Sequence, residues 1–306
     1  MVISLPAPTG LLKNVIPPCR VVWLFVIFFI LQDSAMALPR YIVRADFSNV
    51  RAEVLVNDIP VAMLGPGDSS PFVVPVNQFV VKGRNSLGVI LHAGPDIGTA
   101  DQPWPNGVGA PGYTGPATAT IRIGYYAENE TALGTDKPAL VSLHWEGMAT
   151  PRPQRLERAF DAAIEAAPFA WQSATPIAVV DAATRVQALD YLGRLHALLA
   201  HAQFDEFIGE QSVKLEEIAK VAYGVPADYM RAPMLQALRA HSAPPYALEP
   251  FNRDDIDLRL IANGRMIECL KRGRRPLFEF RRPGSDETLS LPVMLGRIDG
   301  RWQVLR

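Results

Sequence analysis

The side chain that most clearly combines chemical capability with a predicted inward position is His196. On a helix that begins near Asp181, positions at 100° intervals place His196 on the apolar arc, between Leu192 and Leu199. An inward histidine is more often a core residue held by one hydrogen bond than a general base or a ligand contact. We therefore expect a structural role for His196, with ligand binding as the alternative.

Four further residues could join His196 if the downstream elements enclose an open pocket. Tyr191 lies on the same helix, Tyr223 follows it, and Asp257 and Glu268 lie on predicted strands. Polar groups that converge in an apolar pocket are typical of small-ligand sites. A small-molecule enzyme of isomerase, dehydratase or hydrolase type would use the same pocket.

A second candidate binding element is the glycine- and proline-rich stretch from Gly94 to Pro116, which carries Trp104 and Tyr113. Long loops in compact β domains often bind ligands, although either ring could instead pin the loop to its own sheet. Residues 107–112 match G-x-G-x-x-G, but they run into a predicted strand. The dinucleotide fingerprint requires a following helix, so we exclude a dinucleotide site here.

Recognised catalytic and metal-binding motifs are missing from the sequence. It has no G-x-S-x-G, H-E-x-x-H, Walker loop or paired C-x-x-C. Cys269 alternates with Ile267 on a predicted strand and is expected to be a small buried apolar side chain. We therefore predict no cofactor, no metal and no catalytic set.

Charge excludes one class of partner. The formal net charge is −1, whereas a nucleic-acid-binding domain is usually strongly basic or carries a basic stripe. The basic run from Lys271 to Arg275 falls between two predicted strands, which favours a solvated hairpin tip over a contact with an acidic partner.

The elements that would position His196 form the region 181–306. Leu258 and Leu260 alternate with Asp257 and Arg259, and Asn263-Gly264 is a type I′ turn signal. Further strands are predicted over residues 265–270, 277–281, 289–295 and 302–305. Helices followed by hairpins predict an α+β domain, with helices packed on a curved antiparallel sheet.

This order of elements resembles the nuclear-transport-factor-2-like (NTF2-like, or cystatin-like) α+β cone. The resemblance rests on the long helix, on Ala202 to Phe207, and on the ending from Leu291 to Val304, which contains an Asp-Gly turn and Trp-x-Val. It covers about the last two-fifths of the chain. The superfamily includes both enzymes and binding domains, so the fold alone does not select between them.

Residues 38–150 predict an all-β sandwich or jelly roll. β-prone runs separated by turn residues cover 41–47, 52–56, 61–64, 72–76, 79–81, 87–92, 118–126 and 139–145. Val56 to Val61, followed by Gly83 to Val89, resembles jelly-roll accessory domains of carbohydrate-active enzymes. Asp58 stands where those domains have glycine, and no sugar-binding residue carries over.

Residues 151–180 are expected to form a helical linker. Pro151 and Pro153 precede an apolar face formed by Leu156 and Phe160, and Pro168 ends it. A chain of 306 residues is long enough for the two domains that such a linker would join.

Residues 1–37 resemble a targeting segment. Val21 to Leu31 is apolar, and Ala35-Met36-Ala37 forms an A-x-A cleavage site before Leu38. This apolar run is shorter than the roughly 20 residues that span a bilayer. We expect a periplasmic or secreted protein. The alternatives are contact with a membrane through an uncleaved segment and cytoplasmic translation from Met36.

Three functional classes follow from these features. The first is an exported, non-enzymatic binding or interaction protein, for example an inhibitor or immunity-type partner, that binds another protein or a small ligand. The second is the small-molecule enzyme with its site in the cone. The third is a carbohydrate-associated surface protein that uses the sandwich.

Overall fold

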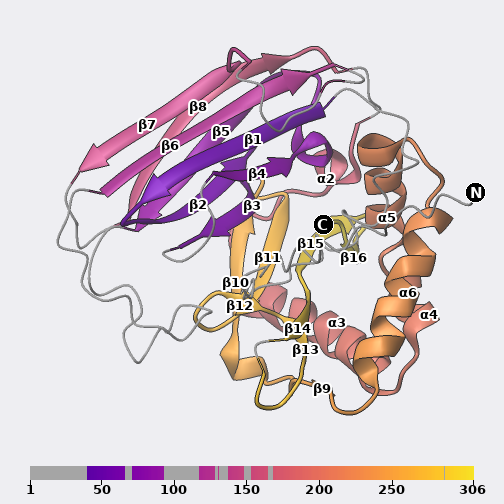
Figure 1. Cartoon of the computed structure of the whole chain (residues 1–306). Helices are drawn as coiled ribbons and strands as arrows, with labels where there is room; N and C mark the ends of the chain where they lie inside the picture. The colour runs from indigo at the N-terminus through magenta and orange to yellow at the C-terminus, as the bar shows by residue number, and fades with distance from the viewer. Residues whose placement is uncertain are drawn as a thin grey trace, which may run out of the picture.

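The computed structural model describes residues 40–65, 71–92, 117–127, 130, 137–147, 153–164, 168–285 and 287–306. Antiparallel sheets dominate these residues, and their α-helices all come from residues 170–242 (Figure 1). The predicted predominance of antiparallel sheet is therefore confirmed.

Two four-stranded sheets form the N-terminal part. One has the order β4-β1-β6-β7 and the other the order β3-β2-β5-β8. Their strands are β1 (Arg40–Ser48), β2 (Arg51–Val56), β3 (Ile59–Leu64), β4 (Phe72–Pro75), β5 (Gly83–His92), β6 (Ala117–Tyr126), β7 (Val141–Gly147) and β8 (Gln154–Ala162). We call them the N-terminal sheet pair.

The two sheets pack face to face through every second side chain of their strands. Val43 and Ile121 from one sheet and Val54 and Val89 from the other are fully buried in one apolar cluster. Because alternate side chains of a strand point to opposite faces, their sequence neighbours point outward from this cluster. Trp145 Nε1 also donates a 2.7 Å hydrogen bond across the sheets to Gln154 Oε1.

Two sequence predictions fail in this part. Residues 77–79 form a short 3₁₀ helix, η1 (Asn77–Phe79), where a strand over 79–81 was expected. Residues 154–162 form the edge strand β8, so the expected helical linker over 151–180 is wrong there. Leu156 and Phe160 are four residues apart, and this spacing suits one helix face and one strand face equally well.

The C-terminal part contains helices and two more sheets, with the orders β10-β11-β15-β16 and β14-β13-β9, and β12 paired to β11. The helices are α2 (Ala170–Ser173), α3 (Ala182–Ala200), α4 (Phe204–Gly209), α5 (Ser212–Ile218), η2 (Ala219–Tyr223), α6 (Asp228–Ser242) and η3 (Arg253–Asp255). The strands are β9 (Ala247–Leu248), β10 (Ile256–Ile261), β11 (Met266–Lys271), β12 (Arg275–Pro276), β13 (Phe278–Arg281), β14 (Thr288–Leu291), β15 (Val293–Ile298) and β16 (Arg301–Val304).

The long helix α3 begins where the sequence indicates. The Asp181 side chain caps it by accepting a 2.7 Å hydrogen bond from Thr184 N, as an N-cap aspartate does. Leu189, Leu192 and Leu195 are buried along its apolar face and pack in a cluster with Ile267 and other strand residues. Helix burial of this kind contributes most of the stability of a helix in a protein.

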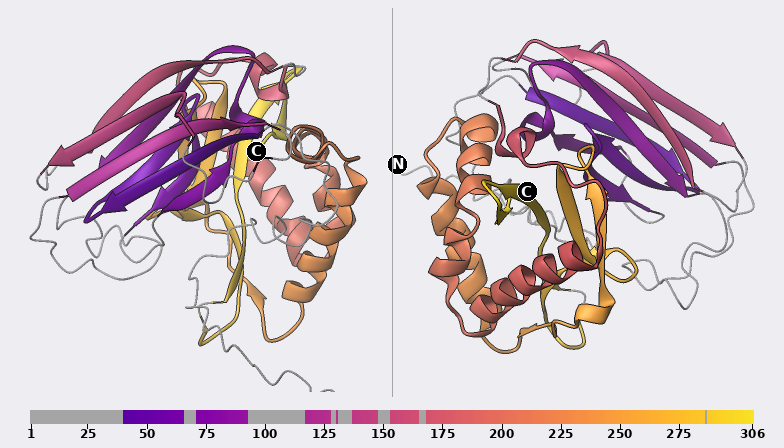
Figure 2. Two further views of the ribbon diagram at one scale, coloured as in Figure 1. Left: turned by 45° about the horizontal axis from the view of Figure 1, so that its top comes forward. Right: turned by 180° about the vertical axis from the view of Figure 1, so that it is seen from behind.

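The sheet that contains β10 and β11 is covered on both faces. Leu258 and Ile267 pack toward the helices, whereas Ile261 and Met266 belong to the apolar cluster of the N-terminal sheet pair. Figure 2 shows from behind the helices on one side of these strands and the N-terminal sheets on the other. The two parts of the chain therefore share a continuous core.

A pair of turns also joins the two parts. Asn57 and Asp58 adopt positive φ in the β2–β3 hairpin, and residues 262–265 connect β10 to β11. This second connection is a four-residue loop rather than the two-residue type I′ turn that Asn263-Gly264 suggested. Asp58 Oδ2 accepts a hydrogen bond from Asn263 N at 3.1 Å. The residue that departs from the jelly-roll pattern is thus used to dock one turn on the other.

Pro292 divides the strand that was predicted as one run over residues 289–295. β14 pairs with β13, and β15 pairs with β11 in a different sheet. Proline has no backbone N–H to donate to a ladder, which is consistent with a break between strands at this position.

Candidate functional site

The predicted pocket that unites His196 with Asp257 and Glu268 does not form. Asp257 and Glu268 occupy the face of β10 and β11 that also carries Arg259, which is directed toward the N-terminal sheet pair. His196 lies on α3, on the opposite side of that sheet. Asp257 and Leu258 are adjacent on a strand and therefore point to opposite faces. Since the apolar face that carries Leu258 packs on the helices, Asp257 lies on the face away from His196.

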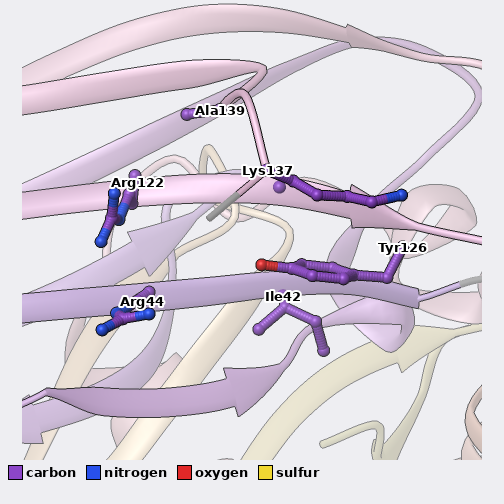
Figure 3. Close-up of a pocket in the computed structure, with 7 residues that line it drawn as sticks. Ile42, Arg44, Arg122, Tyr126, Lys137 and Ala139 are labelled. Atoms are coloured by element: carbon purple, nitrogen blue, oxygen red, sulfur yellow. The ribbon is translucent and has the colours of Figure 1, made fainter. Parts of the chain in front are cut away.

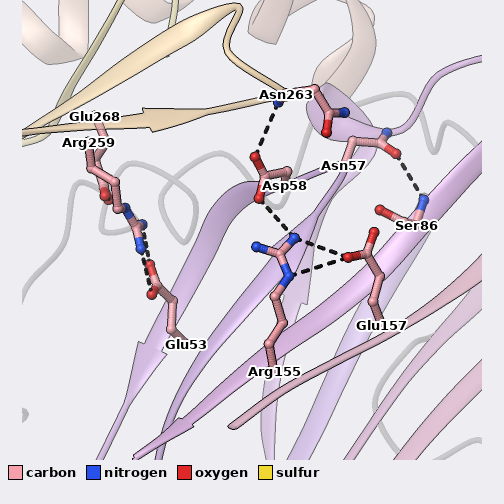
Figure 4. A network of polar contacts seen from close by, with 9 residues as sticks. All are labelled: Glu53, Asn57, Asp58, Ser86, Arg155, Glu157, Arg259, Asn263 and Glu268. Atoms are coloured by element: carbon pink, nitrogen blue, oxygen red, sulfur yellow. Dashed lines mark hydrogen bonds and ion pairs between the residues drawn. The ribbon is translucent and has the colours of Figure 1, made fainter. Parts of the chain in front are cut away.

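Glu268 belongs to a buried ionic network between the two parts of the chain (Figure 4). Its Oε2 lies 2.6 Å from Arg259 Nη2, and Arg259 also forms a two-point pair with Glu53 of β2. Arg274 contacts Glu53 at 2.6 Å. Burial raises the pKa of Glu268, while Arg259 and Arg274 oppose the rise. We assign this network to docking of the two parts.

His196 has the contacts of a structural histidine. Its Nε2 lies 3.0 Å from the Glu249 carbonyl oxygen, and its ring packs against Phe251 and Phe278 at centroid distances of 5.5 and 6.0 Å. Burial lowers the pKa of His196.

Tyr191 is committed to a different contact. Its hydroxyl donates a 2.8 Å hydrogen bond to Glu210 Oε2, and the Arg194 guanidinium pairs with the same carboxylate. Burial, followed by the bond to Glu210, raises the pKa of Tyr191. Tyr191 and His196 therefore do not converge on one polar group.

For three of the four remaining predicted site residues, the side chain lies outside the described part of the structure. Tyr223 is the last residue of η2, and its side chain lies outside the described positions. Trp104 and Tyr113 also lie outside the described residues. Asp257 is exposed to solvent at the surface end of β10.

The basic run from Lys271 to Arg275 is not a solvated hairpin tip. Lys271 Nζ and Arg275 Nη2 each lie 2.6 Å from Glu249 Oε2, while Arg274 reaches Glu53 in the N-terminal part. The run therefore contacts carboxylates on two sides. Periodicity could not show this, because both acceptors come from distant segments.

A candidate binding site that was not predicted lies on the outer face of the sheet β4-β1-β6-β7. It is a shallow depression, partly open to solvent. We call it the sheet-face depression. It is lined by Ile42 and Arg44 of β1, by Arg122, Gly124 and Tyr126 of β6, and by Lys137 and Ala139 of the segment before β7 (Figure 3).

Strand register assembles the floor of the sheet-face depression. Ile42 lies opposite Gly124, and Arg44 lies opposite Arg122. A side chain at Gly124 would place its Cβ 3.2 Å from the Tyr126 ring, so glycine leaves room for this ring. In Figure 3 the Tyr126 hydroxyl points toward the two arginines.

The upper rim of the sheet-face depression carries Lys137, whose charge is paired. Lys137 Nζ lies 5.9 Å from the centre of the Tyr126 ring and forms an ion pair with Glu130. The alternation of Arg44 with buried Val43, and of Arg122 with buried Ile123, indicates outward arginines in the sequence. Only the pairing of β1 with β6 brings them together, and that pairing cannot be read from local pattern.

Two general features bear on other kinds of site. Among the described residues, no group of histidine, cysteine, aspartate and glutamate side chains is arranged to hold a metal ion. In the same part of the chain, no helix combines the length and apolar character needed to cross a membrane. Cys269 is buried, and burial raises the pKa of its thiol, so it is a packing residue in this structure.

Comparison with known proteins gives no relative from which a function could be transferred. No family model, curated protein or solved structure matches this chain.

Proposed function

We propose that this chain is an exported, non-enzymatic binding protein, and that the sheet-face depression is its ligand site. The observation that carries this proposal is the convergence of Arg44, Arg122, Tyr126 and Lys137 around one concave surface. Ligand sites usually have a small number of precisely placed polar groups around a pocket.

The internal contacts of the other candidates also support binding over catalysis. Glu268 is engaged by two arginines, Tyr191 by Glu210, and His196 by a backbone carbonyl. A general base must be able to reach the proton it removes, and each of these groups already has an intramolecular partner.

We also propose the finer architecture and location that the sequence suggests. These are a jelly-roll sandwich followed by an NTF2-like α+β domain, and export directed by residues 1–37. The face-to-face sheets and the helices that pack on the C-terminal strands support the first. N-terminal sequencing of the protein from its own host tests the second. A chain that starts near Leu38 outside the cytoplasm supports export, and cytoplasmic protein that starts at Met36 contradicts it.

Native mass spectrometry of protein purified from its own host tests ligand binding. We expect a mass adduct on the wild-type chain that is lost in Ala139→Trp, because a large ring at this exposed rim position fills the sheet-face depression. The control is Ala159→Trp, at an exposed position of β8 in the other sheet. Equal adducts on both variants would refute the assignment of the site.

A further inference from the structure

We propose that the free edge of β7 pairs with the β7 edge of a second copy of this chain, so that two four-stranded sheets join into one continuous sheet. β7 is paired with β6 along its whole length and is the last strand of its sheet in the described residues. An edge strand presents a row of unpaired N–H and C=O groups, which can template pairing with another strand. The inference is independent of the proposed ligand site, because strands pair in the plane of the sheet and leave its outer face uncovered.

β7 lacks the features that guard the other free edges of the described sheets. Short strands, prolines, bulges and inward-pointing charges all discourage pairing at an edge. β3 contains Pro60 and has an irregular register, and β4 is four residues long and ends at Pro75. β9, β14 and β16 have two to four residues each, and β10 faces the N-terminal part, where Arg259 pairs with Glu53. By contrast, β7 has seven residues and no proline.

The inward face of β7 also differs from that of β8, the neighbouring edge strand of the other sheet. On β7, Leu143 is buried, and Val141 and Trp145 on the same face are half-buried. On β8, Arg158 lies opposite fully buried Leu87, so it is an inward-pointing charge of the kind that prevents edge pairing. The two edges lie beside each other, on the side of the N-terminal sheet pair away from α3 (Figure 1). One edge is therefore guarded, and the other is open.

The sequence of β7 is self-complementary when two copies run antiparallel about a two-fold axis at Leu143. Ser142 then faces His144 of the second copy, and Val141 faces Trp145 of the second copy. Pairs of a β-branched and an aromatic side chain stabilise antiparallel strands. Glu146 is the acidic residue of β7, and in this register the two copies of Glu146 stand about 20 Å apart, because residues along a strand are spaced about 3.4 Å. No like charges therefore face each other.

The surroundings of the β7 edge favour a second copy over a strongly charged partner. Leu140, directly before β7, is 45% exposed, and its N–H donates a 2.9 Å hydrogen bond to the Ile123 carbonyl, so an apolar side chain extends the edge. The charges of β8 beside it sum to zero, since the strand carries two arginines and two acidic residues, Arg155, Glu157, Arg158 and Asp161. An identical copy meets no net repulsion there, and a strongly charged partner gains no attraction.

Pairing of this kind closes at two copies. A two-fold axis uses the same edge on both molecules, which leaves no β7 edge for a third. The opposite edge of the sheet is the short strand β4, which ends at Pro75 and does not extend the assembly. One pair of seven-residue strands gives a small interface, so we expect a dimer that dissociates on dilution.

Sedimentation velocity of the mature wild-type chain tests this inference, and we expect a monomer–dimer equilibrium across a concentration range of about a hundredfold. Two double variants test the register. Ser142→Glu with His144→Glu sets acidic side chains opposite each other at two points and should raise the dimer Kd about tenfold or more. Ser142→Glu with His144→Lys sets opposite charges at the same two points and should retain the dimer. Both variants lose the same 3.0 Å contact between His144 Nδ1 and Thr120 Oγ1, so this loss cannot explain a difference.

The control is Gln236→Glu, which adds a negative charge at an exposed position of α6 and should leave the dimer Kd unchanged. Amide hydrogen exchange of the wild-type chain gives a second measurement, and exchange in β7 should slow as the concentration rises. Exchange that is independent of concentration, or equal dissociation of the two double variants, would overturn the inference. A wild-type chain that stays monomeric throughout, whether its β7 edge is empty or taken by a different protein, would also overturn it.

Discussion

The Arg259 guanidinium forms a bidentate ion pair with the Glu53 carboxylate, with Nη1 2.9 Å from Oε2. The two residues are 206 positions apart in the sequence. The Glu53 side chain is only 2% exposed, and Arg274 contacts the same carboxylate. This pair lies where β2 of the N-terminal sheet pair faces β10. It couples the two parts of the chain where their apolar cores also meet.

Glu53→Gln should lower the free energy of unfolding by about 3 kcal/mol, because Arg259 and Arg274 are then left with the single buried carboxylate of Glu268. Urea denaturation measures this change. The control is Glu157→Gln, which loses an ion pair with Arg155 in which both side chains are more than 40% exposed. Its cost should stay below about 1 kcal/mol. Equal costs would show that the Glu53 network adds nothing to docking.

Lys214→Met should stabilise the protein. Lys214 is buried on α5, and its Nζ reaches Gln211 Oε1 and the Pro292 carbonyl only at 3.4 Å. Burial lowers its pKa from 10.5 to about 8. Between these two values the unfolded chain binds the proton and the folded chain does not, so wild-type stability rises with pH across this window.

The gain from Lys214→Met should therefore be roughly 3 kcal/mol at pH 7 and disappear above about pH 10.5, since one pKa unit corresponds to about 1.36 kcal/mol. Urea denaturation of both proteins at several pH values measures it. Lys82→Met, at an exposed position, is the control and should show no such trend. A constant difference at all pH values would contradict the role of charge burial.

His196→Leu should change the free energy of unfolding by about 1–3 kcal/mol, because it removes the partner of the Glu249 carbonyl. Burial lowers the pKa of His196, so below about pH 6.5 the unfolded chain gains a proton before the folded chain does. Wild-type stability should fall through this range on acidification, and the variant should lack this component.

His196→Gln separates a structural from a functional role. Loss of ligand binding with an unchanged unfolding midpoint would establish His196 as a ligand contact and contradict the structural assignment. We expect binding at the sheet-face depression to persist, because His196 lies on α3 in the C-terminal part.

Two fragments test how the N-terminal sheets are completed. Fragment 38–164 contains β8, whereas fragment 38–150 lacks it and leaves β5 as an unpaired edge. We expect cooperative thermal unfolding only from 38–164, measured by circular dichroism. Cooperative unfolding of 38–150 would show that β8 is dispensable, and two molten fragments would indicate that the shared core requires the C-terminal strands.

The local sequence pattern correctly predicted an element where one of its faces packs against a single apolar core. The period-two runs predicted most strands, and the apolar arc that contains Leu189 and Leu195 predicted the buried face of α3. It failed at Phe160, where the spacing to Leu156 fits both a helix and a strand. It also failed at Pro292, where one apolar run serves two sheets.

The candidate site was less accessible to sequence reasoning, because it depends on pairing between distant strands. Arg44 and Arg122 are unremarkable outward residues until the register of β1 and β6 places them side by side. Glu268 has the chemistry of a site residue, but its partner Arg259 is shared with Glu53, a buried carboxylate from the N-terminal part of the chain. No local window contains either relationship.

The long separation between Glu53 and Arg259 also affects the order of events during synthesis. At about 5–20 residues per second, the ribosome needs roughly 10–40 s to add the residues between them. During this interval the outer face of β2 has no cover from β10. An inward-facing charge on a waiting sheet opposes edge and face association with other chains. We therefore expect the Glu53 charge to oppose aggregation of the nascent N-terminal sheets until Arg259 has been synthesised.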